Sequence, residues 1–194
     1  MKPSIGFAMC GSFCTFKEVL RVMKTLTDYQ LVPILSEAAY QTDTRFGAAA
    51  DFRQQIEDIC GAPILHTLPQ VEPLGPKKLL DALIIAPCTG NTLGKLANGI
   101  ADSAVSFAVK AHLRNGRPVI VAISTNDALC ASAENIGKLL ARRHYYFVPF
   151  GQDDPHGKPY SLVADFSLLP QTLSLALQGK QLQPMLTTTA HNPA

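Results

Sequence analysis

Short apolar runs, each followed by a helix-type pattern, recur along most of this 194-residue chain. Within these runs apolar residues do not alternate with polar ones, which is typical of strands buried on both faces of a sheet. The expected strands are residues 4–10, 30–35, 63–66, 83–86, 118–124 and 145–149. Strands that alternate with helices form right-handed βαβ units. The pattern therefore predicts a Rossmann-like three-layer α/β sandwich with a parallel six-stranded sheet.

The segments between these strands show apolar residues at helical spacing. Phe16, Val19, Leu20, Met23 and Leu26 mark the first helix, and Phe52, Ile56 and Ile59 mark the second. Further helices are expected at 91–97, 102–115, 132–143 and 166–178, and loops at 67–80 and 150–161. No repeat divides the chain, so we expect a single domain over residues 1–182 and a flexible tail over 183–194.

The composition limits the partners that this chain can have. Hydrophobic residues make up 47% of the sequence and charged residues only 16%, so part of the surface is expected to be buried in a homo-oligomer. The sequence has no basic stripe for nucleic acid and no apolar run long enough to span a membrane. The five cysteines include no CxxC pair, and the N-terminus does not resemble a signal peptide. We therefore expect a cytoplasmic protein with free thiols.

Ligands of open parallel sheets bind beyond the C-terminal ends of the strands. Gly11 and Ser12 follow the first strand and could offer backbone N–H groups and a hydroxyl to an anion, although an ordinary turn is an equal alternative. Ser36 follows the second strand and could bind a phosphate, but capping the next helix is the favoured interpretation. Arg45 could pair with an anionic ligand or could simply be exposed.

The segment after the fourth expected strand carries the strongest signal of a binding site. Pro87 cannot continue the ladder of hydrogen bonds, and Gly90 allows a close approach of the backbone to a ligand. Thr89, Asn91 and Thr92 crowd polar groups into a turn that a plain connection does not need.

Polar residues follow the fifth expected strand in the same way. Ser124, Thr125 and Asn126 lie at its end, and Asp127 could act as an acid or base, although helix capping is favoured. The polar loop 150–161 could close over the site as a lid or could be an ordinary surface turn. Its two adjacent aspartates and one histidine are weak evidence for a metal, so we expect none.

Together these segments resemble the flavoprotein family of FMN-dependent cysteine decarboxylases and flavin prenyltransferases. The family signature Pro-Ala-Ser-Ala-Asn-Thr appears here as Pro87-Cys88-Thr89-Gly90-Asn91-Thr92, and its continuation matches Leu93 to Asp102. The resemblance implies bound FMN, with a trimer or dodecamer that places the flavin between protomers. The cofactor-binding residues that it and the strand-end positions suggest are Gly11, Ser12, Phe13, Ser36, Pro87, Cys88, Thr89, Thr92, Ser124 and Thr125.

Two departures from this family bear on the chemistry. The decarboxylases use a His before the fourth strand and a Pro-x-Met-Asn motif; here His66 lies near the first position, and only Asn126 matches the second. The prenyltransferases carry Arg and Glu after the fifth strand, where this chain has Thr125-Asn126-Asp127. Neither reaction transfers to this chain residue by residue.

A closer resemblance to the dipicolinate synthase family spans nearly the whole chain. It rests on TRFG (44–47), EPLGPK (72–77), PCTGN (87–91), ISTNDAL (123–129), PFGQDDP (149–155) and LLPQT (168–172). It implies a protein that helps to make pyridine-2,6-dicarboxylate from a dihydro- or tetrahydrodipicolinate precursor in spore-forming bacteria. It also implies a partner, the A subunit of dipicolinate synthase, which resembles a nicotinamide-dependent dehydrogenase.

The first functional hypothesis is an FMN-assisted oxidation of a small dicarboxylate, which makes the chain part of an oxidoreductase-type synthase. Thr89, Asn91 and Asn126 would hold the substrate carboxylates or the flavin edge. Arg45 or Lys95 would balance charge. A second hypothesis is a binding or scaffolding protein without a redox role. A third is an FMN-dependent decarboxylase of unknown substrate, which requires His66 to reach the flavin face.

Overall fold

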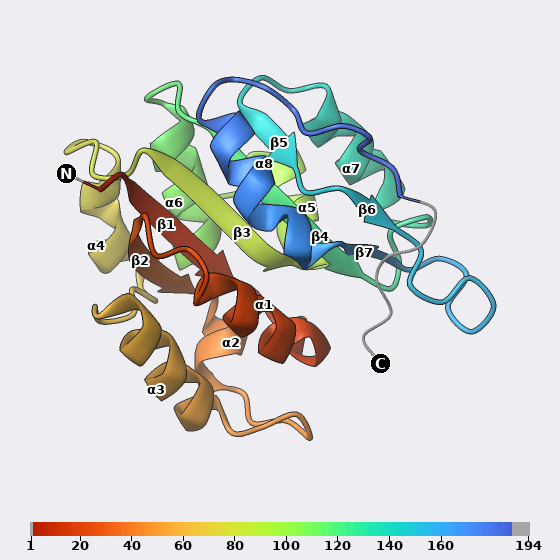
Figure 1. Ribbon diagram of the computed structural model, residues 1–194, viewed down its shortest axis with the longest axis horizontal. Coiled ribbons are helices and arrows are strands. Elements are labelled where there is room, and N and C mark those ends of the chain that lie inside the picture. The colour runs from red at the N-terminus through yellow and green to blue at the C-terminus, as the bar shows by residue number, and fades with distance from the viewer. Residues whose placement is uncertain (1, 188–194) are drawn as a thin grey trace.

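A computed structural model describes residues 2–187 and shows helices on both faces of one sheet (Figure 1). The strands are β1 (Ser4–Met9), β2 (Gln30–Leu35), β3 (Ala82–Cys88), β4 (Val119–Thr125), β5 (Tyr145–Phe147), β6 (Phe150–Gly151) and β7 (Leu162–Ala164). The helices are α1 (Phe16–Met23), α2 (Glu37–Gln41), α3 (Ala49–Cys60), α4 (Leu68–Val71), α5 (Gly90–Ala97), α6 (Ala104–Leu113), α7 (Ala133–Leu140) and α8 (Leu169–Ala176). Short 3-10 turns, η1 (Phe13–Thr15), η2 (Glu72–Leu74) and η3 (Phe166–Leu168), precede or follow helices.

The sheet has the order β2-β1-β3-β4-β7-β6, and β5 also pairs with β4. The pairs β1–β2, β1–β3, β3–β4 and β4–β5 are parallel, whereas β7 runs antiparallel to both β4 and β6. The Rossmann-like α/β class is therefore confirmed. The expected sheet of six parallel strands is wrong in its strand number and in its purely parallel pairing.

The differences have local causes. The expected strand at 63–66 contributes only one bridge, Ile34 to Leu65, because Pro63 has no N–H and the chain soon enters α4. Strands β6 and β7 are two and three residues long, which is too short for any periodicity to show in the sequence. Strand β3 passes Pro87 through a register irregularity between Ile85 and Cys88, so it runs two residues further than expected.

The structure describes residues 183–187 of the tail predicted at 183–194. The backbone N–H of Phe150 donates to the Met185 carbonyl, and the N–H of Thr187 donates to the Phe150 carbonyl, each at 3.0 Å. These bonds attach the segment to β6. Residues 188–194 lie outside the described part of the chain.

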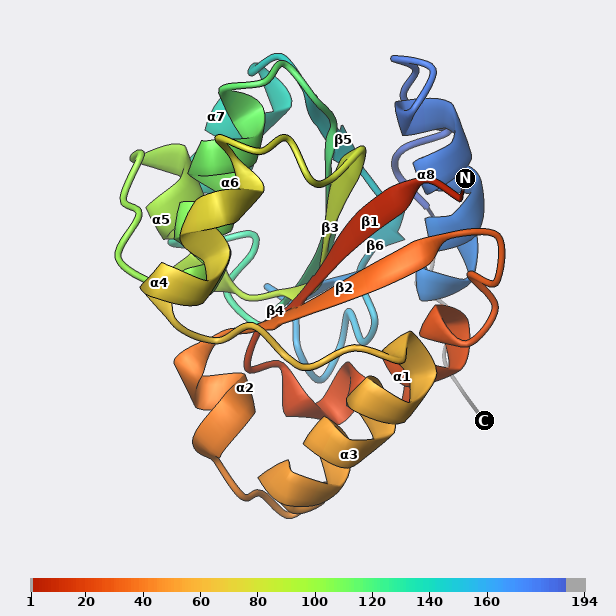
Figure 2. The same ribbon diagram turned by 90° about the vertical axis from the view of Figure 1, so that its left-hand side faces the viewer.

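The helices form two layers around this sheet. Figure 2 shows α4, α5, α6 and α7 on one face, and α1 and α8 on the other. All seven residues of β3 are buried, as an apolar run covered on both faces requires. Because the parallel strands β1 to β4 all point the same way, their C-terminal loops gather at one edge of the sheet.

Candidate functional site

Hydrogen bonds join the loops at the C-terminal edge of the sheet. The N–H of Ser36 donates to the Met9 carbonyl at 3.0 Å, and the N–H of Cys10 donates to the Pro87 carbonyl at 3.2 Å. The hydroxyls of Ser12 and Ser124, which are 112 residues apart, share a hydrogen bond of 2.7 Å. The structure thus brings together the loops that follow β1, β2, β3 and β4.

Two cavities open between these loops and meet at Gly11 and Thr89, which line both. The β2-side cavity has a volume of about 780 Å³, and the β4-side cavity about 680 Å³. Among the expected site residues, the β2-side cavity is lined by Gly11, Ser36, His66, Thr89, Asn91, Thr92 and Lys95. The β4-side cavity is lined by Gly11, Ser12, Phe13, Arg45, Thr89, Ser124, Thr125 and Asn126. Pro87 and Cys88 line neither cavity and lie behind the site.

Two helix N-termini lie on the wall of the β2-side cavity. Thr89 caps α5, and Ser103 caps α6 by accepting from the N–H of Ser106; both caps line the cavity. The unpaired N–H groups and the dipoles of these helices favour an anion. Lys95 also lines this cavity and pairs with Asp102, with 2.8 Å between the Nζ and Oδ1 atoms. The carboxylates of Asp102 and Glu37 line the cavity as well.

Ser36 lies on the wall of the same cavity. Its hydroxyl accepts from the N–H of Ala39 at 3.2 Å, so the favoured capping interpretation is what the geometry shows. The second lone pair of a hydroxyl oxygen and its proton remain able to bind a ligand. Capping and phosphate binding are therefore compatible at this residue.

His66 enters the β2-side cavity as part of a stack of rings. Its imidazole lies 3.7 Å from the Tyr40 ring, with 13° between the planes, and the Arg53 guanidinium lies 4.6 Å from the Tyr40 ring centre. Arg53 also donates to the Tyr40 carbonyl, which fixes Tyr40 from outside. His66 and Asn126 line different cavities, so the two residues that the decarboxylase resemblance suggested are not side by side.

Two buried thiols belong to the site region: Cys10 lines the β2-side cavity, and Cys88 lines neither cavity. The Thr92 hydroxyl donates to the Cys10 sulfur at 3.2 Å. Burial raises the pKa of Cys10 to about 11, although the Thr92 hydrogen bond opposes the shift, and burial also raises the pKa of Cys88 well above its usual value. Both thiols are therefore protonated at neutral pH, and they fill space rather than act as nucleophiles.

Asp127 organises the floor of the β4-side cavity. Its carboxylate accepts from the Thr125 hydroxyl at 2.5 Å and from the Ser132 hydroxyl at 3.0 Å to each oxygen. Asp127 therefore does not cap a helix, although the sequence favours that role. It holds the Thr125 and Ser132 side chains together, and we call these three residues the Asp127 clamp. Gly90 faces this cluster: a Cβ there would lie 2.6 Å from Ser132 Oγ and 2.7 Å from Asp127 Oδ1. Gly90 therefore allows a close approach of the backbone to this clamp.

The loop after β6 forms the outer wall of the β4-side cavity. Asp153 and Lys158 line the cavity and pair with each other at 3.2 Å. Arg45 lines the same cavity, with its guanidinium 4.9 Å from the Phe46 ring centre. Sequence reasoning missed Asp153 and Lys158 as site residues, because a charged residue in a polar loop carries no signal of the direction in which it points.

Membrane spans and metal clusters are both absent from the described residues. No helix within residues 2–187 is both long and apolar enough to cross a bilayer. In the same part of the chain, no three His, Cys, Asp or Glu side chains gather in a way that could hold a metal ion.

The fold, the hydroxyl-lined cavities and the turn after β3 define a flavoprotein, and the chain belongs to the flavoprotein family, which it matches over residues 1–159. Within that family it is similar to the B subunit of dipicolinate synthase from Bacillus subtilis, with 45% identity over 94% of this chain and 92% of the relative. The crystal structure of the same subunit from Bacillus halodurans C superposes with a TM-score of 0.88, at 44% identity over 96% of this chain and 97% of the other. The FMN-dependent cysteine decarboxylase SpaF shares the fold, with a TM-score of 0.66 at 21% identity over 90% of this chain and 97% of that one.

Proposed function

We propose that this chain binds FMN across its two cavities. The β2-side cavity would take the phosphate, because the α5 and α6 N-termini, Lys95 and the Ser36 hydroxyl all favour an anion there. The ring system would reach past Gly11 and Thr89 toward the β4-side cavity. Both volumes fall in the range of about 300–1,000 Å³ that is usual for cofactor sites. FMN-binding proteins among the structural neighbours support the same assignment.

Several residues would hold this cofactor. Ser12 and Ser124 share a hydrogen bond on the wall of the β4-side cavity, and their hydroxyls can turn toward a ligand. Thr125 has its proton committed to Asp127, so its oxygen would accept a hydrogen bond from the cofactor or the substrate. Phe13 lines the β4-side cavity, where its ring would pack against the flavin ring system. Pro87 and Cys88 line neither cavity and would act indirectly, by setting the course of the backbone that leads to Thr89.

We further propose that the chain is part of a dipicolinate synthase that makes pyridine-2,6-dicarboxylate from a dihydro- or tetrahydrodipicolinate precursor during sporulation. The observation that carries this proposal is the 45% identity with the dipicolinate synthase protein of Bacillus subtilis over almost the whole chain. A bound flavin would accept a hydride from the reduced ring. Asn126 and Arg45 would bind carboxylates beside it, Lys95 would balance the phosphate charge, and Asn91 would position the cofactor or substrate between the two cavities.

The proposal includes two kinds of partner. One is the dehydrogenase-like A subunit of dipicolinate synthase, because the relative from Bacillus subtilis is described as one subunit of that enzyme. The other is further copies of this chain, in a trimer or dodecamer. Ile100, Leu129, Leu140 and Leu186 are large apolar side chains at least 40% exposed, which suits burial in an assembly.

The experiment that tests this function is anaerobic mixing of the FMN-loaded chain with a dihydrodipicolinate precursor, without the dehydrogenase-like partner. Loss of the oxidised-flavin absorbance, with release of dipicolinate, is the expected result. An unchanged flavin spectrum, together with stimulation of the dehydrogenase-like partner by this chain, would assign a scaffolding role instead. Release of carbon dioxide that is lost in the His66→Asn variant would assign a decarboxylase.

A further inference from the structure

Lys158 and Asp153 form an ion pair on the wall of the β4-side cavity. The Nζ and Oδ2 atoms are 3.2 Å apart, and the two side chains are 53% and 24% exposed. A single contact of this length between partly exposed groups contributes little stability. The exposed Lys158 ammonium group can therefore move from Asp153 to a better anion that enters the cavity.

The loop that carries this pair is attached to the cavity floor at its far end. The Ser161 side chain is fully buried, and its hydroxyl donates to Asn126 Oδ1 at 3.5 Å. The N–H of Leu129 donates to the Tyr160 carbonyl at 3.0 Å. These contacts hold the loop backbone in place beside Asn126, whereas the four-carbon stem of Lys158 can swing without moving the loop.

The charges around the cavity show why such a movement is needed. Three carboxylates line it, from Glu18, Asp127 and Asp153, against the two cations Arg45 and Lys158. Asp127 is already occupied by two hydroxyl groups. A dicarboxylate would add two negative charges, and Arg45 can neutralise only one of them.

Asp153 is an anion while it is paired with Lys158. Burial raises the pKa of Asp153, but the Lys158 ammonium beside it opposes that effect, and the net pKa lies below its usual range. The carboxylate is thus able to hold Lys158 while the cavity contains no anionic substrate.

We propose that Lys158 is the residue that selects a second carboxylate on the substrate, and that it exchanges its ion pair with Asp153 for a pair with that carboxylate. The proposal rests on the dicarboxylate substrate of the proposed function. Asp153 competes with the substrate for Lys158, so removing either residue changes affinity in opposite directions. A loop residue with a purely structural role would not give opposite signs.

The test is a calorimetric titration of the FMN-loaded chain with pyridine-2,6-dicarboxylate and with pyridine-2-carboxylate, which lacks the second carboxylate. Lys158→Met should weaken binding of the dicarboxylate about 10-fold and binding of the monocarboxylate much less. Asp153→Asn should tighten binding of the dicarboxylate about 3-fold or more, because Lys158 is then released. The double variant should behave like Lys158→Met alone, because without Lys158 there is nothing to release.

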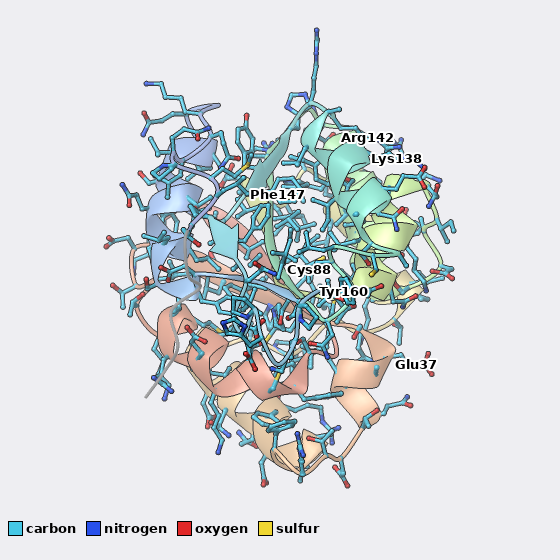
Figure 3. The ribbon with its side chains drawn as sticks, turned by 90° about the vertical axis from the view of Figure 1, so that its right-hand side faces the viewer. Glu37, Cys88, Lys138, Arg142, Phe147 and Tyr160 are labelled. Atoms are coloured by element: carbon cyan, nitrogen blue, oxygen red, sulfur yellow. The ribbon has the colours of Figure 1, made fainter. Side chains whose placement is uncertain are left out.

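Lys138→Met is the matched control. Lys138 lies on α7 (Figure 3). It pairs with Glu134 at 2.7 Å and does not line the β4-side cavity. Its removal deletes an ion pair of the same kind and should leave both affinities unchanged.

Three results would overturn the inference. If Lys158→Met and Asp153→Asn both weaken binding, the pair only supports the loop. If the wild type binds the dicarboxylate and Lys158→Met binds it equally well, the inference fails while the proposed function stands. If the wild type holds FMN but binds neither pyridine acid, both the proposed substrate and the inference are wrong.

Discussion

Replacing Gly90 with Ala tests whether the Asp127 clamp and α5 fit together as tightly as the structure shows. The added Cβ would lie 2.6 Å from Ser132 Oγ, 2.7 Å from Asp127 Oδ1 and 2.9 Å from Thr125 Oγ1. Carbon and oxygen atoms do not approach this closely without a bond, so either α5 or the clamp must move. Overpacking of this kind costs about 1–3 kcal/mol.

The displaced clamp adds a second cost. Asp127 would lose or lengthen charge-assisted hydrogen bonds with Thr125 and Ser132, which are worth about 1.5–3 kcal/mol. Alanine gains at most about 1 kcal/mol over glycine in a helix, which offsets part of this. The free energy of unfolding should therefore fall by roughly 2–4 kcal/mol, and each kcal/mol lowers Tm by about 2–4 °C in a chain of this size.

The assay is urea-induced unfolding followed by circular dichroism, with the midpoint and slope fitted separately. Gly137→Ala is the control, because Gly137 lies within α7 and a Cβ there meets nothing within 4 Å. This control should be as stable as the wild type or up to about 1 kcal/mol more stable. A Gly90→Ala variant at wild-type stability would refute the clamp geometry.

Two other predictions concern the pH dependence of stability and the phosphate. Burial lowers the pKa of His112 from 6.5 to about 4, despite its hydrogen bond to the Pro118 carbonyl at 3.1 Å, so the unfolded chain binds a proton between these pH values that the folded chain does not. Stability should fall as pH drops from about 6.5 to about 4, by up to about 3 kcal/mol, and His112→Leu should flatten this slope in unfolding titrations across that range. Ser36→Ala should cost about 1 kcal/mol as a lost cap. It should also weaken FMN about 10-fold while leaving riboflavin, which has no phosphate, nearly unchanged in fluorescence titrations; an equal loss for both flavins would rule out a phosphate contact.

The sequence predicted the centre of the fold because its signals there are local and strong. The apolar run at Leu83–Ala86 can be covered only on both faces, and the structure buries all of β3. Ligands of parallel sheets bind beyond the C-terminal ends of the strands, and this rule placed the loops at Gly11 and Thr89 in one site. In the structure the two cavities meet at these residues.

The missed features depend on contacts between distant residues. Strand β7 forms because Leu162–Ala164 pair with β4 and β6. The sequence of three residues alone does not predict such long-range pairing. Asp127 lies at a position where a helix cap is expected, but its carboxylate accepts hydrogen bonds from the Thr125 and Ser132 hydroxyls instead. Lys158 lines the cavity in a loop whose end at Ser161 contacts Asn126, a residue 35 positions away in the sequence.

The measurement that tests the central claim most directly is calorimetric titration of FMN and riboflavin into the flavin-free chain. Our account predicts one FMN per chain, with riboflavin binding about 10-fold or more weakly, since only FMN can use the anion site between α5, α6 and Ser36. A chain that binds no flavin, or that binds riboflavin as tightly as FMN, would contradict it.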